Sequence, residues 1–244
     1  MNISLQFLLL AAMATTTRFA HCFSAPAATS ATVNKQNTLS DQQIMDLAKE
    51  YVVGKNGFYA PIDPEAHSED FVFRGGVIGP LNKADYCTTM TKLGVFNAFD
   101  LNPNSFGFCV DPELKNACRF YVRYTGKQVQ PWRVAGTPYD IPISDKPVAG
   151  PTESFCIQFD DDGKTKFFTI SAPMNFGNPV EPTTGGLGAV LGLFCHVGQD
   201  IAAKSAMNAN LRTATNFFAN LLPADVAPPK TKSNPEELPT WWKE

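Results

Sequence analysis

The stretch that decides the fold is Ser154–Ser171, which reads SFCIQFDDDGKTKFFTIS. Its first residues alternate apolar and more polar side chains, which predicts a strand with one buried face. Asp160–Gly163 predicts a tight turn, and Lys166–Ser171 predicts a second strand. The expected buried set of the first strand is Phe155, Ile157 and Phe159. We therefore expect an antiparallel hairpin with an aromatic and aliphatic inner face.

A further strand, Cys118–Tyr124, repeats this alternation. One face carries Cys118, Phe120, Val122 and Tyr124, and the other carries Arg119, Tyr121 and Arg123. The apolar face is expected to pack on helices, so both arginines should point away from the core. Shorter apolar runs predict strands at Phe71–Arg74 and Ser105–Val110.

Two helices are predicted in the first half of the chain. Ser40 can cap a helix over Asp41–Val53, and Asn82 can cap another over Lys83–Phe96. The residues at helical spacing are Ile44, Leu47, Ala48 and Tyr51 in the first helix, and Tyr86, Met90 and Leu93 in the second. Tyr51 is thus expected to point inward. Helices combined with antiparallel hairpins predict an α+β fold rather than a doubly wound parallel sheet.

The element order and the run Ile157–Lys164 resemble the NTF2-like superfamily, particularly its SnoaL-like and ketosteroid-isomerase-like members. The resemblance spans Ser40–Ala172. It implies an α+β cone, in which a curved antiparallel sheet wraps around N-terminal helices and leaves a conical pocket. A helical C-terminal extension is expected beyond the cone, since the resemblance explains nothing after Pro173.

The resemblance also allows a comparison with the ketosteroid isomerase residues. Tyr51 matches the tyrosine that stabilises the oxyanion, whereas Arg74 matches the carboxylate base and Phe155 matches the protonated aspartic acid. An arginine is not a base near neutral pH, and a phenylalanine donates no hydrogen bond. The catalytic residues are therefore unknown. Asp70 and Glu153 remain candidates for the acid or base that a SnoaL-like isomerase, cyclase or hydrolase requires.

The predicted pocket is apolar with few polar groups, which suits a hydrophobic ligand carrying one anionic or carbonyl end. Its expected lining is Tyr51, Arg74, Phe120, Val122, Phe155 and Ile157. Two plainer interpretations stay open. Tyr51 could be a core tyrosine bonded to a backbone carbonyl, and Arg74 could form a surface ion pair with Asp70 or Glu69.

The N-terminal part contains no Asp or Glu before Asp41 and divides into two targeting segments. Residues 1–22 predict a signal peptide, because their apolar run is much shorter than the roughly 20 residues that span a membrane. Residues 23–36, rich in Ala, Ser and Thr, predict a transit segment. The junction Ala20–Pro26 resembles the bipartite presequences of diatom-type algae, in which an aromatic residue such as Phe23 decides plastid import. This resemblance implies a plastid (chloroplast) protein imported through the secretory route.

The net charge of the chain and the spacing of its cysteines limit the partners and cofactors that we expect. Without the basic residues Arg18 and Lys35 of these segments, the formal net charge of −3 becomes −5. An acidic chain is not expected to bind nucleic acid, because such binding needs a basic surface. The remaining cysteines are Cys87, Cys109, Cys118, Cys156 and Cys195. They form no Cys-x-x-Cys pair, so we expect free thiols, with neither a metal site nor a cofactor.

The rest of the chain is expected to form a cone over residues 37–178 and a distinct C-terminal part. Residues 179–222 combine a glycine-rich segment, 183–198, with one amphipathic helix over Asp200–Leu222. The glycine-rich segment is expected to cover the mouth of the cone, with tight packing on a helix or a dip into a membrane surface as alternatives. Residues 223–244 predict a loosely attached proline-rich tail.

The leading functional hypothesis is a plastid protein, with weak catalysis or none, that binds a small hydrophobic metabolite in this pocket. One alternative is a SnoaL-like isomerase, cyclase or hydrolase acting on such a metabolite. Another is a structural or assembly partner of a plastid complex. Residues 185–222 are the expected contact with a membrane or another protein, and a homodimer is a further alternative. Whether the chain is an enzyme stays open, because no complete acid–base set is found.

Overall fold

The computed structural model describes residues 37–171 and 180–243. The predicted signal peptide and transit segment, residues 1–22 and 23–36, lie outside these described residues, as does the stretch 172–179. The described residues all belong to one unit of the chain, residues 35–244.

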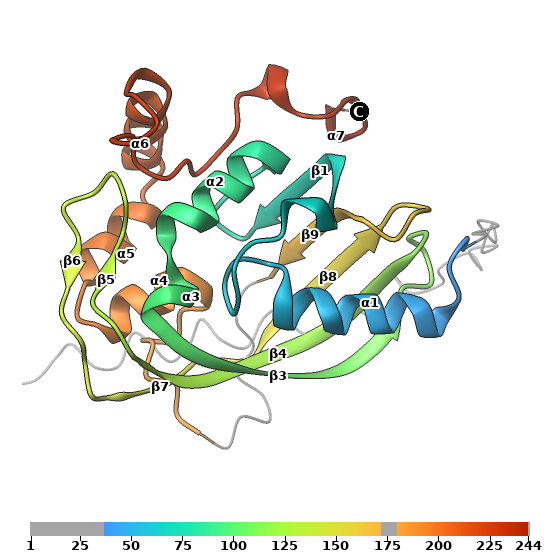
Figure 1. Cartoon of the computed structure of the whole chain (residues 1–244), viewed down its shortest axis with the longest axis horizontal. Coiled ribbons are helices and arrows are strands. Elements are labelled where there is room, and N and C mark those ends of the chain that lie inside the picture. The colour runs from blue at the N-terminus through green and yellow to red at the C-terminus, as the bar shows by residue number, and fades with distance from the viewer. Residues whose placement is uncertain (1–36, 172–179, 244) are drawn as a thin grey trace, which may run out of the picture. The chain divides into compact units, whose positions relative to one another are not determined.

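A seven-stranded sheet forms the framework, with strand order β2-β1-β9-β8-β4-β3 and a short β7 that also pairs with β4. Its strands are β1 His67–Gly75, β2 Leu81–Asn82, β3 Phe99–Val110, β4 Ala117–Gln128, β7 Pro147–Ala149, β8 Glu153–Phe159 and β9 Thr165–Ile170. A separate two-stranded ribbon joins β5, Trp132–Arg133, to β6, Asp140–Ile141. Within residues 37–171 and 180–243, all strand pairs are antiparallel except β1 with β9. The sheet curves strongly along β3 and β4 (Figure 1).

Two helices pack on the concave face of this sheet. Helix α1, Asp41–Gly54, is capped by Ser40, as predicted. The side chains of Ser40 and Gln43 also bond each other's backbone, which forms a capping box. Helix α2, Lys83–Leu93, is capped by Asn82 and ends at Gly94, whose φ of +56° suits glycine. The predicted continuation of α2 to Phe96 is therefore wrong, and a short separate helix α3, Val95–Ala98, follows. Helix α1 contacts β3 and β4, whereas α2 contacts β1.

The inner face of the sheet is apolar, as the strand alternation predicts. Cys118, Phe120, Val122 and Tyr124 of β4 are buried, and so are Phe155, Ile157 and Phe159 of β8. Arg119 is exposed on the opposite face, and Arg123 is half-buried there. The predicted α+β class, with a curved, mostly antiparallel sheet around N-terminal helices, is confirmed.

The C-terminal extension consists of several short helices instead of one long one. They are α4 Ala189–His196, α5 Asp200–Met207, α6 Ala209–Leu221 and α7 Thr240–Lys243. The predicted single helix Asp200–Leu222 breaks at Asn208. The Asn208 side chain accepts hydrogen bonds from the backbone N–H groups of Asn210 and Leu211, so it caps a new helix. In the described part of the chain, no helix is long and apolar enough to cross a membrane.

The proline-rich tail is firmly docked, which contradicts the prediction of loose attachment. Lys92 Nζ donates to the carbonyl of Ala227 at 2.7 Å, and Ser233 Oγ donates to Asp85 Oδ2 at 2.6 Å. Trp241 Nε1 donates to the carbonyl of Asp70 on β1 at 2.9 Å. These bonds lie along α2 and β1, so the tail stabilises the wall of the cone that faces it.

Candidate functional site

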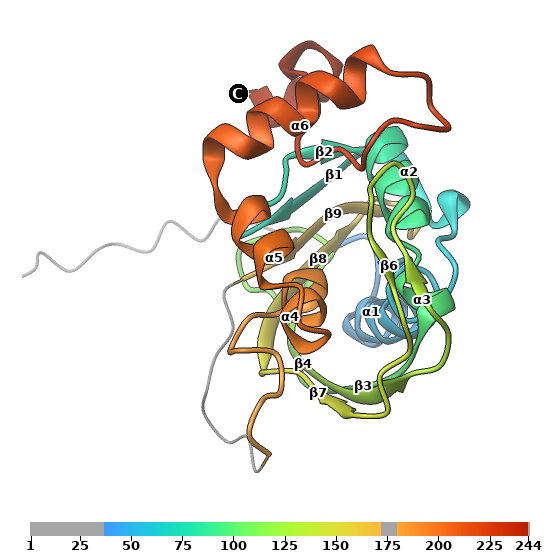
Figure 2. The same ribbon diagram turned by 90° about the vertical axis from the view of Figure 1, so that its left-hand side faces the viewer.

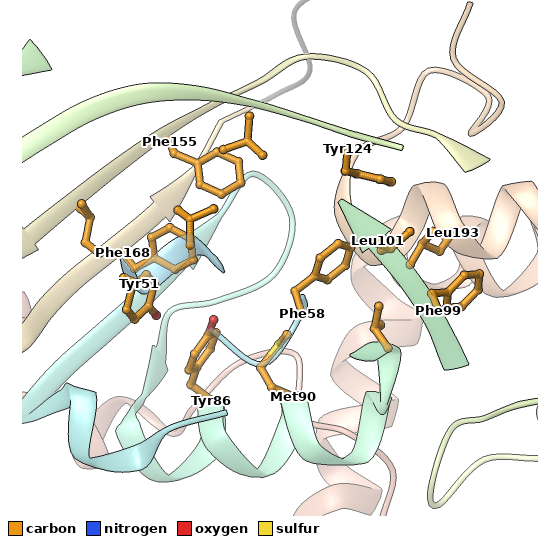
Figure 3. Close-up of a cluster of buried hydrophobic side chains, with 14 of the residues drawn as sticks. Tyr51, Phe58, Tyr86, Met90, Phe99, Leu101, Tyr124, Phe155, Phe168 and Leu193 are labelled. Atoms are coloured by element: carbon orange, nitrogen blue, oxygen red, sulfur yellow. The ribbon is translucent and has the colours of Figure 1, made fainter. Parts of the chain in front are cut away.

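A cavity of about 430 Å³ lies between the sheet and the C-terminal extension. Its lining is predominantly apolar and comes from distant parts of the chain. Side chains from the first half of the chain include Phe58, Tyr59, Phe73, Tyr86 and Met90, and those from β8 and β9 include Phe155 and Phe168. Leu187–Leu191, Phe194, Ala206, Met207 and Pro229–Thr231 complete it from the C-terminal side. Figure 3 shows Phe58, Met90, Phe155 and Phe168 within one buried cluster.

Of the predicted pocket residues, Phe155 lines this cavity and the other five do not. Phe120, Val122 and Ile157 are buried in the core beside it. The physical reason is the position of α1, which packs on β3 and β4 and fills that part of the cone. The open space is left beside β1, β9 and the first residues of β8.

Tyr51 lies in a buried polar cluster next to the cavity. Its hydroxyl is 3.0 Å from His67 Nε2, and His67 Nδ1 is 2.8 Å from the carbonyl of Asp63. A carbonyl only accepts, so Nδ1 carries the proton and Tyr51 donates to Nε2. Burial lowers the pKa of His67 to about 4, which keeps the ring neutral near pH 7. The Tyr51 hydroxyl points toward that of Tyr86, a lining residue (Figure 3).

His67 was missed by sequence reasoning, although it begins the same strand as the predicted run Phe71–Arg74. Its burial was not foreseeable from the local pattern, because Glu69 and Asp70 stand between it and the apolar run. Tyr51 is a buried core tyrosine, but its partner is an imidazole rather than the backbone carbonyl of the plainer interpretation.

The side chains of Arg74 and Asp70 form their hydrogen bonds and ion pairs outside the cavity. Arg74 Nη1 donates to the carbonyls of Ile78 and Gly79, at 3.4 and 2.9 Å, so it holds the loop between β1 and β2. The predicted ion pair with Asp70 or Glu69 is wrong, because Asp70 pairs with Lys166 and Glu69 pairs with Lys83. Asp70 does not line the cavity, which leaves Glu153 as the carboxyl to consider.

Glu153 brings one carboxyl group into the apolar cavity. The residue is 4% exposed, and its Oε2 accepts a hydrogen bond from the N–H of Ala189 at 3.0 Å. Burial raises the pKa of Glu153 to about 7, and the Ala189 N–H opposes this only in part. Among the described residues, Lys230 is the other lining residue with a charged side chain, and it pairs with Asp85 at 2.9 Å.

The start of α4 is shaped around this carboxyl. Gly188 packs against the Glu153 carboxylate so closely that a methyl group at that position would overlap it. Ala189 adopts φ +43°, which is unfavourable for a residue with a side chain. Its carbonyl accepts a hydrogen bond from the Tyr124 hydroxyl at 3.3 Å. These contacts hold the glycine-rich segment against the cavity, where Leu187–Leu191 form part of the wall.

The arrangement can do two things chemically. The apolar wall can remove a hydrophobic molecule from water, and the single carboxyl can donate or accept a proton near neutral pH. Among the described residues, no group of three or more His, Cys, Asp or Glu side chains could hold a metal ion. Of the cysteines in the described residues, Cys87, Cys109, Cys118 and Cys195 are free thiols.

No protein-family model matches this chain, and no curated protein does. Several solved structures are similar to this chain, including the following three. AclR of Streptomyces galilaeus is 17% identical over 54% of this chain and 89% of its own, with a TM-score of 0.41. A SnoaL-like protein of Jannaschia sp. CCS1 is 14% identical over 53% of this chain and 84% of its own, with a TM-score of 0.38.

The third is a steroid delta-isomerase of Pseudomonas aeruginosa. It is 15% identical over 70% of this chain and 99% of its own, with a TM-score of 0.33. At these scores the similarity says nothing about the ligand or the reaction of this chain. The fold of this chain is defined by the strand order and register of its own sheet.

Proposed function

We propose that this protein binds a small hydrophobic molecule in the cavity between the sheet and the C-terminal extension. The observation that carries the proposal is the cavity itself, whose wall is almost entirely apolar and aromatic. Its volume of about 430 Å³ lies within the range of sites for small molecules. Residues 187–191 of the expected partner segment 185–222 supply part of the cavity wall. A membrane or protein contact through this segment stays a prediction. A homodimer also stays a prediction.

The polar end of the ligand is proposed to be a neutral carbonyl or hydroxyl group. Arg74, the predicted partner of an anionic end, lies outside the lining, whereas Glu153 lies inside it. A protonated carboxyl donates to a carbonyl, and an ionised one accepts from a hydroxyl. An anionic ligand end next to Glu153 would instead be repelled above neutral pH.

Titration with the neutral apolar fluorophore N-phenyl-1-naphthylamine tests the binding proposal. We expect an emission increase that saturates at one probe per chain. A linear, unsaturable increase would show that the cavity takes up no such molecule and would contradict the proposal.

The buried carboxyl favours acid–base catalysis as a second candidate function, in a SnoaL-like isomerase, cyclase or hydrolase. A carboxyl with a pKa of about 7 is present in both protonation states at neutral pH, which suits a group that must take up and release a proton. In this case Glu153→Gln would abolish turnover of the native ligand while leaving probe binding intact. Unchanged turnover in this variant would exclude the residue as the catalyst.

The plastid location is proposed from the sequence of residues 1–36 alone. We expect a fluorescent protein fused behind this segment to enter the plastid of a diatom-type alga, and Phe23→Ala to leave it in the secretory route instead. The matched control is Phe19→Ala, which lies on the other side of the junction. Plastid import that survives Phe23→Ala, or is lost equally with the control, would contradict this assignment.

A further inference from the structure

Asn56 places an amide group in the apolar wall of the cavity. It follows helix α1, which ends at Gly54. Figure 2 shows α1 end-on inside the curve formed by β3 and β4, which it contacts. Asn56 is 3% exposed and lines the cavity, and a bridge to Ile62 holds its backbone. The residue is thus a buried polar group at a fixed place in the wall.

The orientation of this amide is set by the turn that follows it. Asn56 Oδ1 accepts hydrogen bonds from the backbone N–H groups of Phe58 and Tyr59, at 2.9 and 3.4 Å. A backbone N–H only donates, so the amide atom that faces both groups is the oxygen. Gly57 adopts φ +78° in this turn, a conformation that suits glycine. The position of Nδ2 therefore follows from the hydrogen bonds of Oδ1.

Asn56 Nδ2 carries two N–H donors and forms no hydrogen bond with another described residue. Across the residues that the structure describes, the fully enclosed side-chain nitrogen or oxygen without a partner is His196 Nε2. Asn56 Nδ2 is therefore not sealed inside the protein, and it opens on the cavity that the residue lines. Buried side-chain donors nearly always have a partner. A bound ligand can supply the acceptor for this one.

Two hydroxyl groups of the cavity wall already donate within the protein. The hydroxyl of Tyr86 donates to the carbonyl of Asn56 at 2.9 Å, and Thr89 Oγ1 donates to the carbonyl of Lys230 at 3.1 Å. Tyr86 and Thr89 both line the cavity. Each hydroxyl has a single proton, so neither donates to a ligand while these bonds hold. Asn56 Nδ2, by contrast, has both of its protons available.

The amide of Asn56 and the carboxyl of Glu153 offer a ligand different chemistry. Glu153 donates only while it is protonated, and its pKa is about 7. The amide does not titrate, so it donates on both sides of neutral pH. An amide N–H₂ group requires an acceptor, and a carbonyl oxygen is an acceptor that brings no donor of its own. A ligand hydroxyl would bring a proton that needs an acceptor in an otherwise apolar wall.

We propose that Asn56 determines the specificity of the cavity by donating from Nδ2 to a carbonyl oxygen of the ligand. The ligand class is then an apolar molecule that carries a ketone, aldehyde or ester group. A hydrocarbon of the same shape would fill the cavity but leave Nδ2 unpaired. This inference deepens the proposed function and rests on it, because the cavity must first take up a hydrophobic molecule.

Three matched probes test the role of Asn56. They are 2-acetylnaphthalene, 1-(2-naphthyl)ethanol and 2-ethylnaphthalene, which share one skeleton and carry a ketone, an alcohol and no oxygen. Displacement of N-phenyl-1-naphthylamine gives the affinity of each. The measurement is made at about pH 8.5, where Glu153 is mostly ionised and does not donate. The quantity compared between proteins is the ratio of ketone affinity to hydrocarbon affinity, since a purely structural defect would weaken both probes alike.

Asn56→Asp keeps an acceptor for the N–H groups of Phe58 and Tyr59 but replaces the donor with an oxygen. We expect it to lower the ketone-to-hydrocarbon ratio at least about tenfold while the hydrocarbon still binds. Asn56→Ser, whose hydroxyl can also accept in this turn, should lower the ratio as well, so the test does not depend on one variant folding. The matched control is Thr89→Val, which removes a lining hydroxyl that already donates to Lys230 and should leave the ratio unchanged.

Several outcomes would overturn the inference. They are an unchanged ratio in both Asn56 variants, an equal fall in Thr89→Val, or a larger loss of affinity for the alcohol than for the ketone. A wild-type preference for the ketone that disappears as the pH rises past 7 would assign the donor to Glu153 instead. Saturable binding of N-phenyl-1-naphthylamine and of the hydrocarbon, without the expected change in ratio, refutes only the role of Asn56. If none of the probes binds saturably, the proposed function fails and this inference fails with it.

Discussion

Replacing Glu153 with glutamine is expected to raise the free energy of unfolding by about 3 kcal/mol above neutral pH and to leave it nearly unchanged in acid. The carboxyl is buried, and its pKa rises from 4.5 to about 7 in the folded protein. Each pKa unit corresponds to about 1.4 kcal/mol. Glutamine keeps the acceptor for the Ala189 N–H but carries no charge.

The direction of this pH-dependent change in stability follows from proton binding by Glu153. Between about pH 4.5 and 7 the unfolded chain releases the proton of Glu153 while the folded chain keeps it. The contribution of this group to stability therefore falls as the pH rises through that window, and it then stays low. Glu153→Gln has no carboxyl to ionise, so its stability does not fall in this way. Its melting temperature should therefore exceed that of the wild type by roughly 6–12 °C above pH 7.

Thermal unfolding of both proteins across this pH range measures the difference directly. His67, whose pKa is lowered, acts in the opposite direction in acid, but it is the same in both proteins and cancels. Glu236→Gln, at an exposed position, is the control and should follow the wild-type curve. A difference between wild type and Glu153→Gln that does not change with pH would mean that the carboxyl is not buried in an apolar cavity.

Ala206→Trp is expected to weaken binding of N-phenyl-1-naphthylamine at least tenfold. Ala206 lines the cavity from α5, so an indole at this position would occupy space that the ligand needs. The residue is half-buried at the edge of the cavity, and the fold should tolerate the larger side chain.

The control for this prediction is Ala135→Trp, an exposed position after β5 that does not line the cavity. It should bind the probe as the wild type does. Equal binding by Ala206→Trp and the wild type, with both variants folded by circular dichroism, would place the probe somewhere other than in this cavity.

Local features of the sequence predicted much of the fold because the interactions that form them are local. The capping box at Ser40 and the cap at Asn82 involve residues within one helical turn. The alternation in Cys118–Tyr124 follows from the pleat of a strand, whatever packs on it. The break at Asn208 could also have been predicted, since asparagine is a common helix cap, but the apolar spacing on both sides concealed it.

The location of the cavity could not be predicted in the same way. It depends on where α1 fills the cone and on where the C-terminal extension docks, and both are contacts between distant segments. Phe120 and Phe155 share the buried face of the sheet, yet only Phe155 lies where the cone remains open. Likewise, the strand pattern places Glu153 at the end of an apolar run, but its burial is produced by Gly188 and Ala189 of the extension.

A crystal structure of the protein with N-phenyl-1-naphthylamine bound would test the central claim most directly. We predict electron density for the probe inside the cavity, in contact with Phe155 and Phe194 and within reach of the Glu153 carboxyl. Probe density confined to the outer surface of α6, with the cavity filled by the protein's own side chains, would contradict the proposed binding function.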